Sequence, residues 1–149
     1  MRVRLPVMLF VAGLLVVVAA FGVASPASAV RDRTFIATLT GAAEVPGPGD
    51  TDGFGMATVT LTPGTTELCY TITVQDIAPA AAAHIHVGSA DEAGQIVVHL
   101  TAPTNGTSSG CETLERALFT QILAQPQDYY VNVHNADFRA GAVRGQLGR

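Results

Sequence analysis

Three of the four histidines stand in two short motifs in which polar and apolar residues alternate. His84 and His86 flank Ile85, and His134 closes the run Asn132-Val133-His134. Successive side chains of a β-strand point to opposite faces, so His84 and His86 share a face with bases roughly 6 to 7 Å apart. Neutral imidazole suits copper and zinc, and three imidazoles are an adequate ligand set. The spacing therefore predicts a copper or zinc site at His84, His86 and His134.

A second interpretation of these histidines stays open. They could hydrogen-bond backbone, Tyr or Asn groups within a buried polar network without holding a metal. The fourth histidine, His99, is expected to be a solvated or partly packed strand residue, and the sequence leaves open whether it joins the other three.

Further polar residues are expected on the same face as the histidines. Strand parity groups Tyr130 and Asn132 with His134, and it groups Arg144 with Gln146. We predict a polar network formed by Glu44, Tyr130, Asn132, Arg144 and Gln146. For Glu44 and Arg144 the expected roles are an ion pair or loop-anchoring hydrogen bonds, because a guanidinium can hold a carboxylate and carbonyls together. No Ser-His-Asp arrangement or paired carboxylates are recognisable, so we assign no catalytic residue.

The elements that must position these residues are mostly strands. Period-two alternation predicts strands over residues 34–40, 55–62, 67–74, 84–87, 95–101, 129–134 and 142–147. Pro63-Gly64 predicts a hairpin turn, and the segment 101–110 is expected to be an exposed loop. Leu114, Leu118 and Ile122 recur every four residues before Pro126, which predicts one helix. The fold class expected is all-β, a two-layer Greek-key or immunoglobulin-like sandwich with one short helix.

The N-terminus has the order of a signal peptide. Arg2 and Arg4 precede an apolar run over residues 5–24, and Ala27 and Ala29 fit an A-x-A-like cleavage site. We predict a leader over residues 1–29 and one domain over residues 30–149. The alternative is a leader retained as a membrane anchor, because the run is about long enough to span a bilayer. We expect cleavage and a location in the extracellular space or cell envelope, with membrane contact only through the uncleaved leader.

Charge and cysteine content narrow the classes of partner. Without the leader, 6 arginines face 12 acidic residues and no lysine is present, a net charge of −6. Nucleic acid is therefore excluded as an expected partner, because its recognition needs clustered basic residues. Cys69 and Cys111 are the only cysteines, and an exported domain with one pair is expected to crosslink them.

Three ordered stretches of the chain resemble the CHRD (chordin-type) domain. They are Phe35-Ile-Ala-Thr-Leu-Thr-Gly-Ala-Ala-Glu-Val-Pro46, then Ala83-His-Ile-His-Val-Gly88 with Gly94-Gln-Ile-Val-Val98, and then Asp128-Tyr-Tyr-Val-Asn-Val-His134 with Gly141-Ala-Val-Arg-Gly-Gln-Leu147. The resemblance implies an extracellular β-sandwich with no agreed chemistry. In chordin such domains belong to an antagonist of bone morphogenetic proteins, a role that fold likeness alone does not transfer to a single-domain chain.

The order of four residues is also similar to copper-zinc superoxide dismutase. That family has an H-x-H strand, a later histidine and then an arginine after a Gly-rich turn, as His84, His86, His134 and Arg144 stand here. The run of acidic and histidine zinc ligands that the family places near a bridging histidine is missing around His99.

Three functional hypotheses follow from these observations. The first is a non-enzymatic secreted binding or structural module that holds a transition metal on its histidine face. The second is a copper-dependent redox enzyme of the superoxide-dismutase type, in which Arg144 would steer an anion. The third is a protein-interaction domain whose loops bind an extracellular protein or envelope ligand, which a large exposed apolar patch would support.

Overall fold

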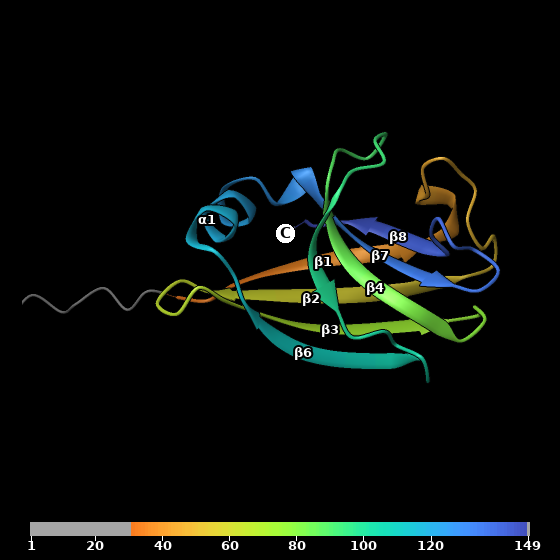
Figure 1. Cartoon of the computed structure of the whole chain (residues 1–149), viewed down its shortest axis with the longest axis horizontal. Coiled ribbons are helices and arrows are strands. Elements are labelled where there is room, and N and C mark those ends of the chain that lie inside the picture. Colours follow the sequence, from red (N-terminus) through yellow and green to blue (C-terminus); the bar gives the residue numbers. More distant parts are fainter. Residues whose placement is uncertain (1–30, 149) are drawn as a thin grey trace, which may run out of the picture.

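The computed structural model describes residues 31–148, which form one β-sheet with a single α-helix (Figure 1). The elements are β1 (Arg33–Thr40), η1 (Gly41–Ala43), β2 (Phe54–Thr62), β3 (Glu67–Gln75), β4 (Ala80–Val87), β5 (Ile96–Leu100), β6 (Thr107–Thr113), α1 (Arg116–Ala124), η2 (Pro126–Asp128), β7 (Tyr129–Asn135) and β8 (Val143–Gln146). The predicted leader lies outside the described residues. None of the helices within residues 31–148 has the length and apolar character needed to cross a bilayer.

All eight strands pair in one antiparallel sheet. Their order across the sheet is β5-β4-β7-β8-β1-β2-β3-β6. The predicted all-β class with one short helix is confirmed. The strands form one continuous, nearly closed sheet rather than two separate ones.

Side-chain hydrogen bonds link the two edges of the sheet. Tyr70 on β3 accepts a bond from the Thr101 N–H at 2.8 Å and donates to Thr101 Oγ1 at 3.1 Å. Ser108 on the edge strand β6 donates to the Thr101 carbonyl at 2.7 Å. Because Thr101 directly follows the other edge strand, β5, these bonds hold the sheet in its curled form.

The core lies inside the curled sheet and follows the alternation of the strands. On β1, Phe35, Ala37 and Leu39 are fully buried while the residues between them are exposed. Val131 and Val133 of β7 are fully buried as well and belong to the same core cluster. Burial of this apolar surface is the main force that stabilises the fold.

The predicted helix is confirmed as α1, which lies at one end of the sheet (Figure 1). Phe119 and Ile122 are its buried residues, and both belong to the core cluster. The helix ends at Ala124, two residues before Pro126, which has no N–H with which to continue the helix.

The prediction of an exposed loop over residues 101–110 is partly wrong. Its second half belongs to β6, which pairs with β3. The sequence of β6 is Thr-Ser-Ser-Gly-Cys-Glu-Thr, and none of its residues is fully covered. This edge strand lacks the alternation of apolar and polar residues from which a strand can be predicted. Its extended conformation depends on its pairing with β3.

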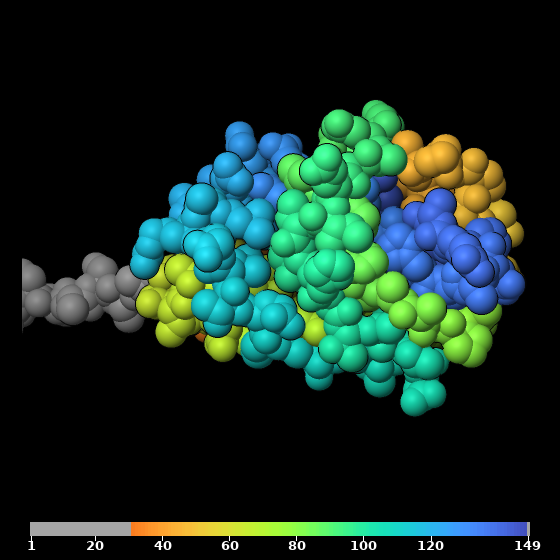
Figure 2. Space-filling view, in the orientation of Figure 1, coloured from red at the N-terminus to blue at the C-terminus, as the bar shows by residue number. Residues whose placement is uncertain are grey.

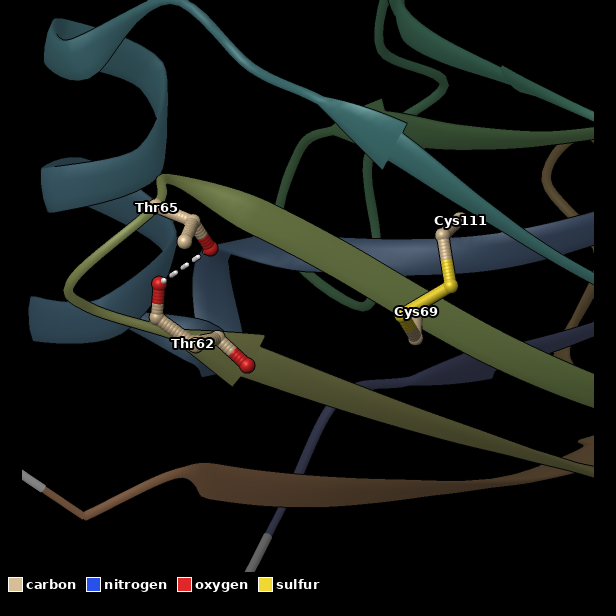
Figure 3. Close-up of a disulfide and its surroundings, with 4 residues drawn as sticks. All are labelled: Thr62, Thr65, Cys69 and Cys111. Atoms are coloured by element: carbon tan, nitrogen blue, oxygen red, sulfur yellow. Dashed lines mark hydrogen bonds between the residues drawn. A yellow bond between two sulfur atoms is a disulfide. The ribbon is translucent and has the colours of Figure 1, made fainter.

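The predicted disulfide between Cys69 and Cys111 is confirmed (Figure 3). The two cysteines are register partners on β3 and β6, with Cα atoms 4.0 Å apart. The bond closes a sequence separation of 42 residues. It therefore holds the edge strand β6 against the rest of the sheet.

Candidate metal site

The histidine motifs and the arginine motif lie on neighbouring strands. In the sheet β7 runs between β4 and β8, and the register places Asn132 opposite both His84 and Arg144. The next row of the same face contains His86, Tyr130 and Gln146. The expected polar face is therefore formed by β4, β7 and β8, opposite the face that packs into the core.

Three histidines meet on this face. His84 Nδ1 lies 3.2 Å from His134 Nε2, and the ring centroids of His86 and His134 are 6.0 Å apart. Each of the three residues offers a ring nitrogen, and these nitrogens all lie within 4.8 Å of one another. Two nitrogens bound to one tetrahedral ion at 2.0–2.1 Å would stand about 3.3 Å apart, close to the spacing of His84 and His134.

Backbone carbonyls orient two of the three rings. His86 Nδ1 donates to the Gly94 carbonyl at 3.0 Å, and His134 Nδ1 donates to the Arg139 carbonyl at 3.2 Å. A carbonyl can only accept, so in the neutral rings the proton is on Nδ1 and Nε2 is unprotonated and carries a lone pair. Such bonds are the usual second-sphere support of metal-bound histidines.

The electrostatics of the cluster favour neutral rings. Burial, followed by the neighbouring His134, His86 and His99, lowers the pKa of His84 from 6.5 to about 4. Burial also lowers the pKa values of His86 and His134, against the opposing effect of the carbonyls that they contact. A neutral imidazole is the form that binds a metal ion, so no proton needs to leave these rings at neutral pH.

Tyr130 links the histidines to Arg144. Its ring stacks on His86 with centroids 4.9 Å apart, and the Arg144 Cζ lies 3.4 Å from the centre of the same ring. The hydroxyl of Tyr130 accepts a bond from the Gly94 N–H at 2.9 Å. Tyr130 thus contacts His86 directly and also fixes the residue whose carbonyl holds His86.

Two loops cover the part of the polar face formed by Asn132, Arg144 and Gln146. Arg144 Nη2 donates to the Ser89 carbonyl at 2.6 Å, and Gln146 Nε2 donates to the Gly88 carbonyl at 2.6 Å. These bonds anchor the loop between β4 and β5. From the loop between β1 and β2, Glu44 accepts a bond from Asn132 Nδ2 at 3.3 Å. Of the two roles expected for Arg144, the structure shows the loop-anchoring hydrogen bond.

Glu44 is buried beside these residues, with 6% of its surface exposed. Burial raises its pKa from 4.5 to about 7, against the opposing effects of the Asn132 hydrogen bond and the Arg144 charge. Within residues 31–148, five buried side-chain atoms have no hydrogen-bond partner, and all belong to this face. They are Glu44 Oε1, His86 Nε2, Asn132 Oδ1, Arg144 Nη1 and Gln146 Oε1.

His99 lies at the rim of the cluster. It is the register partner of His84 on β5, and the two ring centroids are 5.0 Å apart. His99 is exposed and is not one of the three residues whose nitrogens converge. Glu67 lies close enough to Cys69 and Cys111 to form a second group of potential ligands, but the disulfide removes both thiols.

Two backbone carbonyls contribute to the site and could not be predicted from side-chain types. They belong to Gly94, before β5, and to Arg139, in the turn after β7. Gly94 packs so closely that an added Cβ would lie 1.4 Å from the Val87 carbonyl oxygen. A glycine beside an H-x-H strand is the available signal, because it indicates a close backbone approach.

Comparison with known families decides the classification. The model of the CHRD domain matches residues 35–147. The chain belongs to the CHRD domain family. No curated protein and no solved structure matches the chain.

The CHRD match includes β4, β7 and β8, the three strands that form the polar face. The resemblance predicted from the three sequence stretches is therefore confirmed. In this chain the CHRD domain is β-rich and contains one disulfide, and the histidine cluster lies wholly within the matched residues.

Proposed function

We propose that this CHRD domain is a secreted, non-enzymatic binding module that holds one copper or zinc ion through His84, His86 and His134. The observation that carries the proposal is the orientation of two rings. His86 and His134 each direct a proton to a backbone carbonyl, which leaves an unprotonated Nε2 on each ring as a potential metal ligand. The Nε2 of His86 is buried and has no other partner.

The contact between His84 and His134 supports the same assignment. Without a metal, one proton between His84 Nδ1 and His134 Nε2 can hold the two rings 3.2 Å apart. A metal ion would take the place of that proton, and His84 would then carry its proton on Nε2. Metal binding thus needs a change of tautomer at His84 but no rearrangement of the strands.

Export supports a role in the extracellular space or cell envelope. The predicted leader over residues 1–29 has the order of a signal peptide. Disulfides persist in oxidising compartments, and the domain contains one. The partner that we expect is an extracellular protein or envelope ligand.

Metal titration of the purified chain tests the proposal. We expect one equivalent of copper or zinc to bind the native protein and to be lost in the variant with His84, His86 and His134 all changed to Ala. The matched control is His99→Ala, because His99 lies beside His84 but outside the converging set. Binding that is absent from the native protein, or unchanged in the triple variant, would leave the histidines as members of a hydrogen-bonded network.

Copper redox chemistry is the second candidate function. It uses the same three ligands and assigns Arg144 to an incoming anion. Arg144 hydrogen-bonds to Ser89 and contacts the ring of Tyr130, which does not favour a position over the histidines. Superoxide consumption by the copper-loaded protein, compared with the triple histidine variant, separates this function from simple binding.

A loop-mediated interaction domain is the third candidate. A large exposed apolar patch would support it. The large exposed apolar side chains of the described residues include Ile36, Phe54 and Met56, which lie on the strands β1 and β2. Because these side chains lie on strands, they do not support an interaction carried by the loops.

A further inference from the structure

A cavity separate from the histidine cluster lies between the two loops that cover the polar face. Its volume is about 420 Å³, and it is lined by residues of both loops and of β8. Figure 2 shows these loops side by side, the β1–β2 loop in orange and the β4–β5 loop in green. Pockets that hold small molecules usually have volumes of about 300 to 1,000 Å³, so this cavity is of ligand size.

Three polar side chains that line the cavity have unused hydrogen-bonding groups. Arg144 and Glu44 are 1% and 6% exposed, and Arg144 Nη1 and Glu44 Oε1 both have no partner. The two residues therefore do not bond to each other through these atoms. Gln146 donates its amide to the Gly88 and Gln127 carbonyls, so its unpartnered Oε1 is fixed as an acceptor.

Among residues 31–148, Arg144 hydrogen-bonds to no carboxylate, although its charge acts on the nearby Glu44 carboxyl group. Its recorded contacts are a backbone carbonyl and the face of Tyr130, neither of which carries a negative charge. Leaving a buried cation without a partner of opposite charge is costly. A water molecule could supply hydrogen bonds but not the charge, whereas a carboxylate supplies both.

The rest of the lining fits a small zwitterion. Asp91, which is exposed, adds a second carboxyl group beside Glu44 and the Gln146 oxygen. These acceptors are suited to an ammonium group. The remaining wall consists of small apolar residues, Ala42, Ala43, Val45 and Ala90.

We propose that this cavity binds a small aliphatic α-amino acid, with its carboxylate on Arg144 and its ammonium group on Glu44, Gln146 and Asp91. The side chain of the ligand would pack against the alanines. None of these residues is among the three histidines, so the proposal holds whether or not a metal binds.

Amide chemical shifts of the chain, followed during titration with L-alanine in the presence of EDTA, test the proposal. We expect saturable shifts at the amides of Ala43, Ala90 and Asp91. L-Lactate, which lacks the ammonium group, and L-alaninamide, which lacks the carboxylate, should each bind at least about tenfold more weakly. Lactate or alaninamide binding as tightly as alanine would overturn the assignment of the group that it lacks.

A variant that fills the cavity provides the structural control. Ala90→Leu adds volume at an exposed lining position, so the fold should be kept while affinity for L-alanine falls by at least about tenfold. Ala93→Leu is the matched control, because Ala93 is exposed in the same loop but does not line the cavity. Unsaturable shifts in the native protein, or equal affinity in both variants, would overturn the proposal.

Discussion

The ring of Tyr130 stacks on the imidazole of His86, with planes only 10° apart and centroids separated by 4.9 Å. The same tyrosine accepts a hydrogen bond from the Gly94 N–H, and the Gly94 carbonyl accepts one from His86 Nδ1. Tyr130 therefore fixes His86 in two ways, through its ring and through its hydroxyl.

Removal of this hydroxyl should weaken both the fold and the metal site. Tyr130→Phe keeps the ring stack but leaves the Gly94 N–H without its acceptor, which should lower the free energy of unfolding by about 1 kcal/mol. Because Gly94 orients His86, affinity for copper or zinc should fall about tenfold. Denaturant unfolding and metal titration measure the two effects.

The control for that variant is Tyr129→Phe. Tyr129 neighbours Tyr130 on β7, but its hydroxyl makes only a 3.5 Å contact with Gln121, away from the histidines. The Tyr129→Phe variant should therefore bind copper or zinc as tightly as the native protein. Equal loss of affinity in both variants would contradict the role assigned to Tyr130.

Acid should destabilise the domain through its histidines, and Glu44 should oppose this effect. His84 has its pKa lowered to about 4, so its contribution to stability is present above pH 6.5 and is lost as the pH falls toward 4. Glu44 has its pKa raised to about 7, so its contribution is present below pH 4.5 and is lost as the pH rises through 7. Between pH 4.5 and 6.5 the two groups act in opposite directions.

The variant Glu44→Gln separates these contributions. It removes the opposing group, so its thermal midpoint should fall more steeply than that of the native protein as the pH is lowered from 6.5 to 4.5. Midpoints measured in EDTA across this range test the slope. Glu92→Gln, which changes an exposed carboxylate, should follow the native protein. A slope for Glu44→Gln equal to or shallower than the native one would contradict the assignment.

The disulfide should stabilise the fold without affecting the histidine cluster. Loss of a crosslink that spans 42 residues, as in Cys69→Ala with Cys111→Ala, should cost about 2 to 4 kcal/mol. Metal affinity should stay the same, because the disulfide joins β3 to β6 and neither strand carries a residue of the histidine cluster. Denaturant unfolding of the double variant measures the cost. Unchanged stability would show that strand pairing between β3 and β6 holds the edge strand without the disulfide.

Sequence reasoning succeeded where a short-range pattern determines the structure. Alternation placed the strands, and side-chain parity placed His84 with His86 and Asn132 with His134 on one face. Each of these results depends on residues within a single strand. Whether the histidine and arginine motifs lie side by side could not be predicted, because it depends on which strands become neighbours in the sheet.

The remaining features depend on contacts between distant segments. The edge strand β6 has no hydrophobic alternation, so only its pairing with β3 reveals it. The carbonyls of Gly94 and Arg139 carry no side-chain signal, although they orient His86 and His134. The cavity beside Arg144 is formed by two loops that lie far apart in the chain.

A methyl group added at Gly141 should disrupt the contact between the β7–β8 turn and Glu44. Gly141 has a φ of +152°, which side-chain-bearing residues rarely adopt, and an added Cβ would lie 2.2 to 2.4 Å from the Glu44 carboxyl atoms. Gly141→Ala must therefore displace a buried side chain that bonds Asn132, and we expect a loss of about 2 to 4 kcal/mol in the free energy of unfolding. Gly64→Ala is the matched control, because nothing lies within 4 Å of its added Cβ, and it should change stability by less than about 0.5 kcal/mol. Denaturant unfolding compares the two variants; equal stability would mean that Glu44 can leave its position beside Gly141 at no cost.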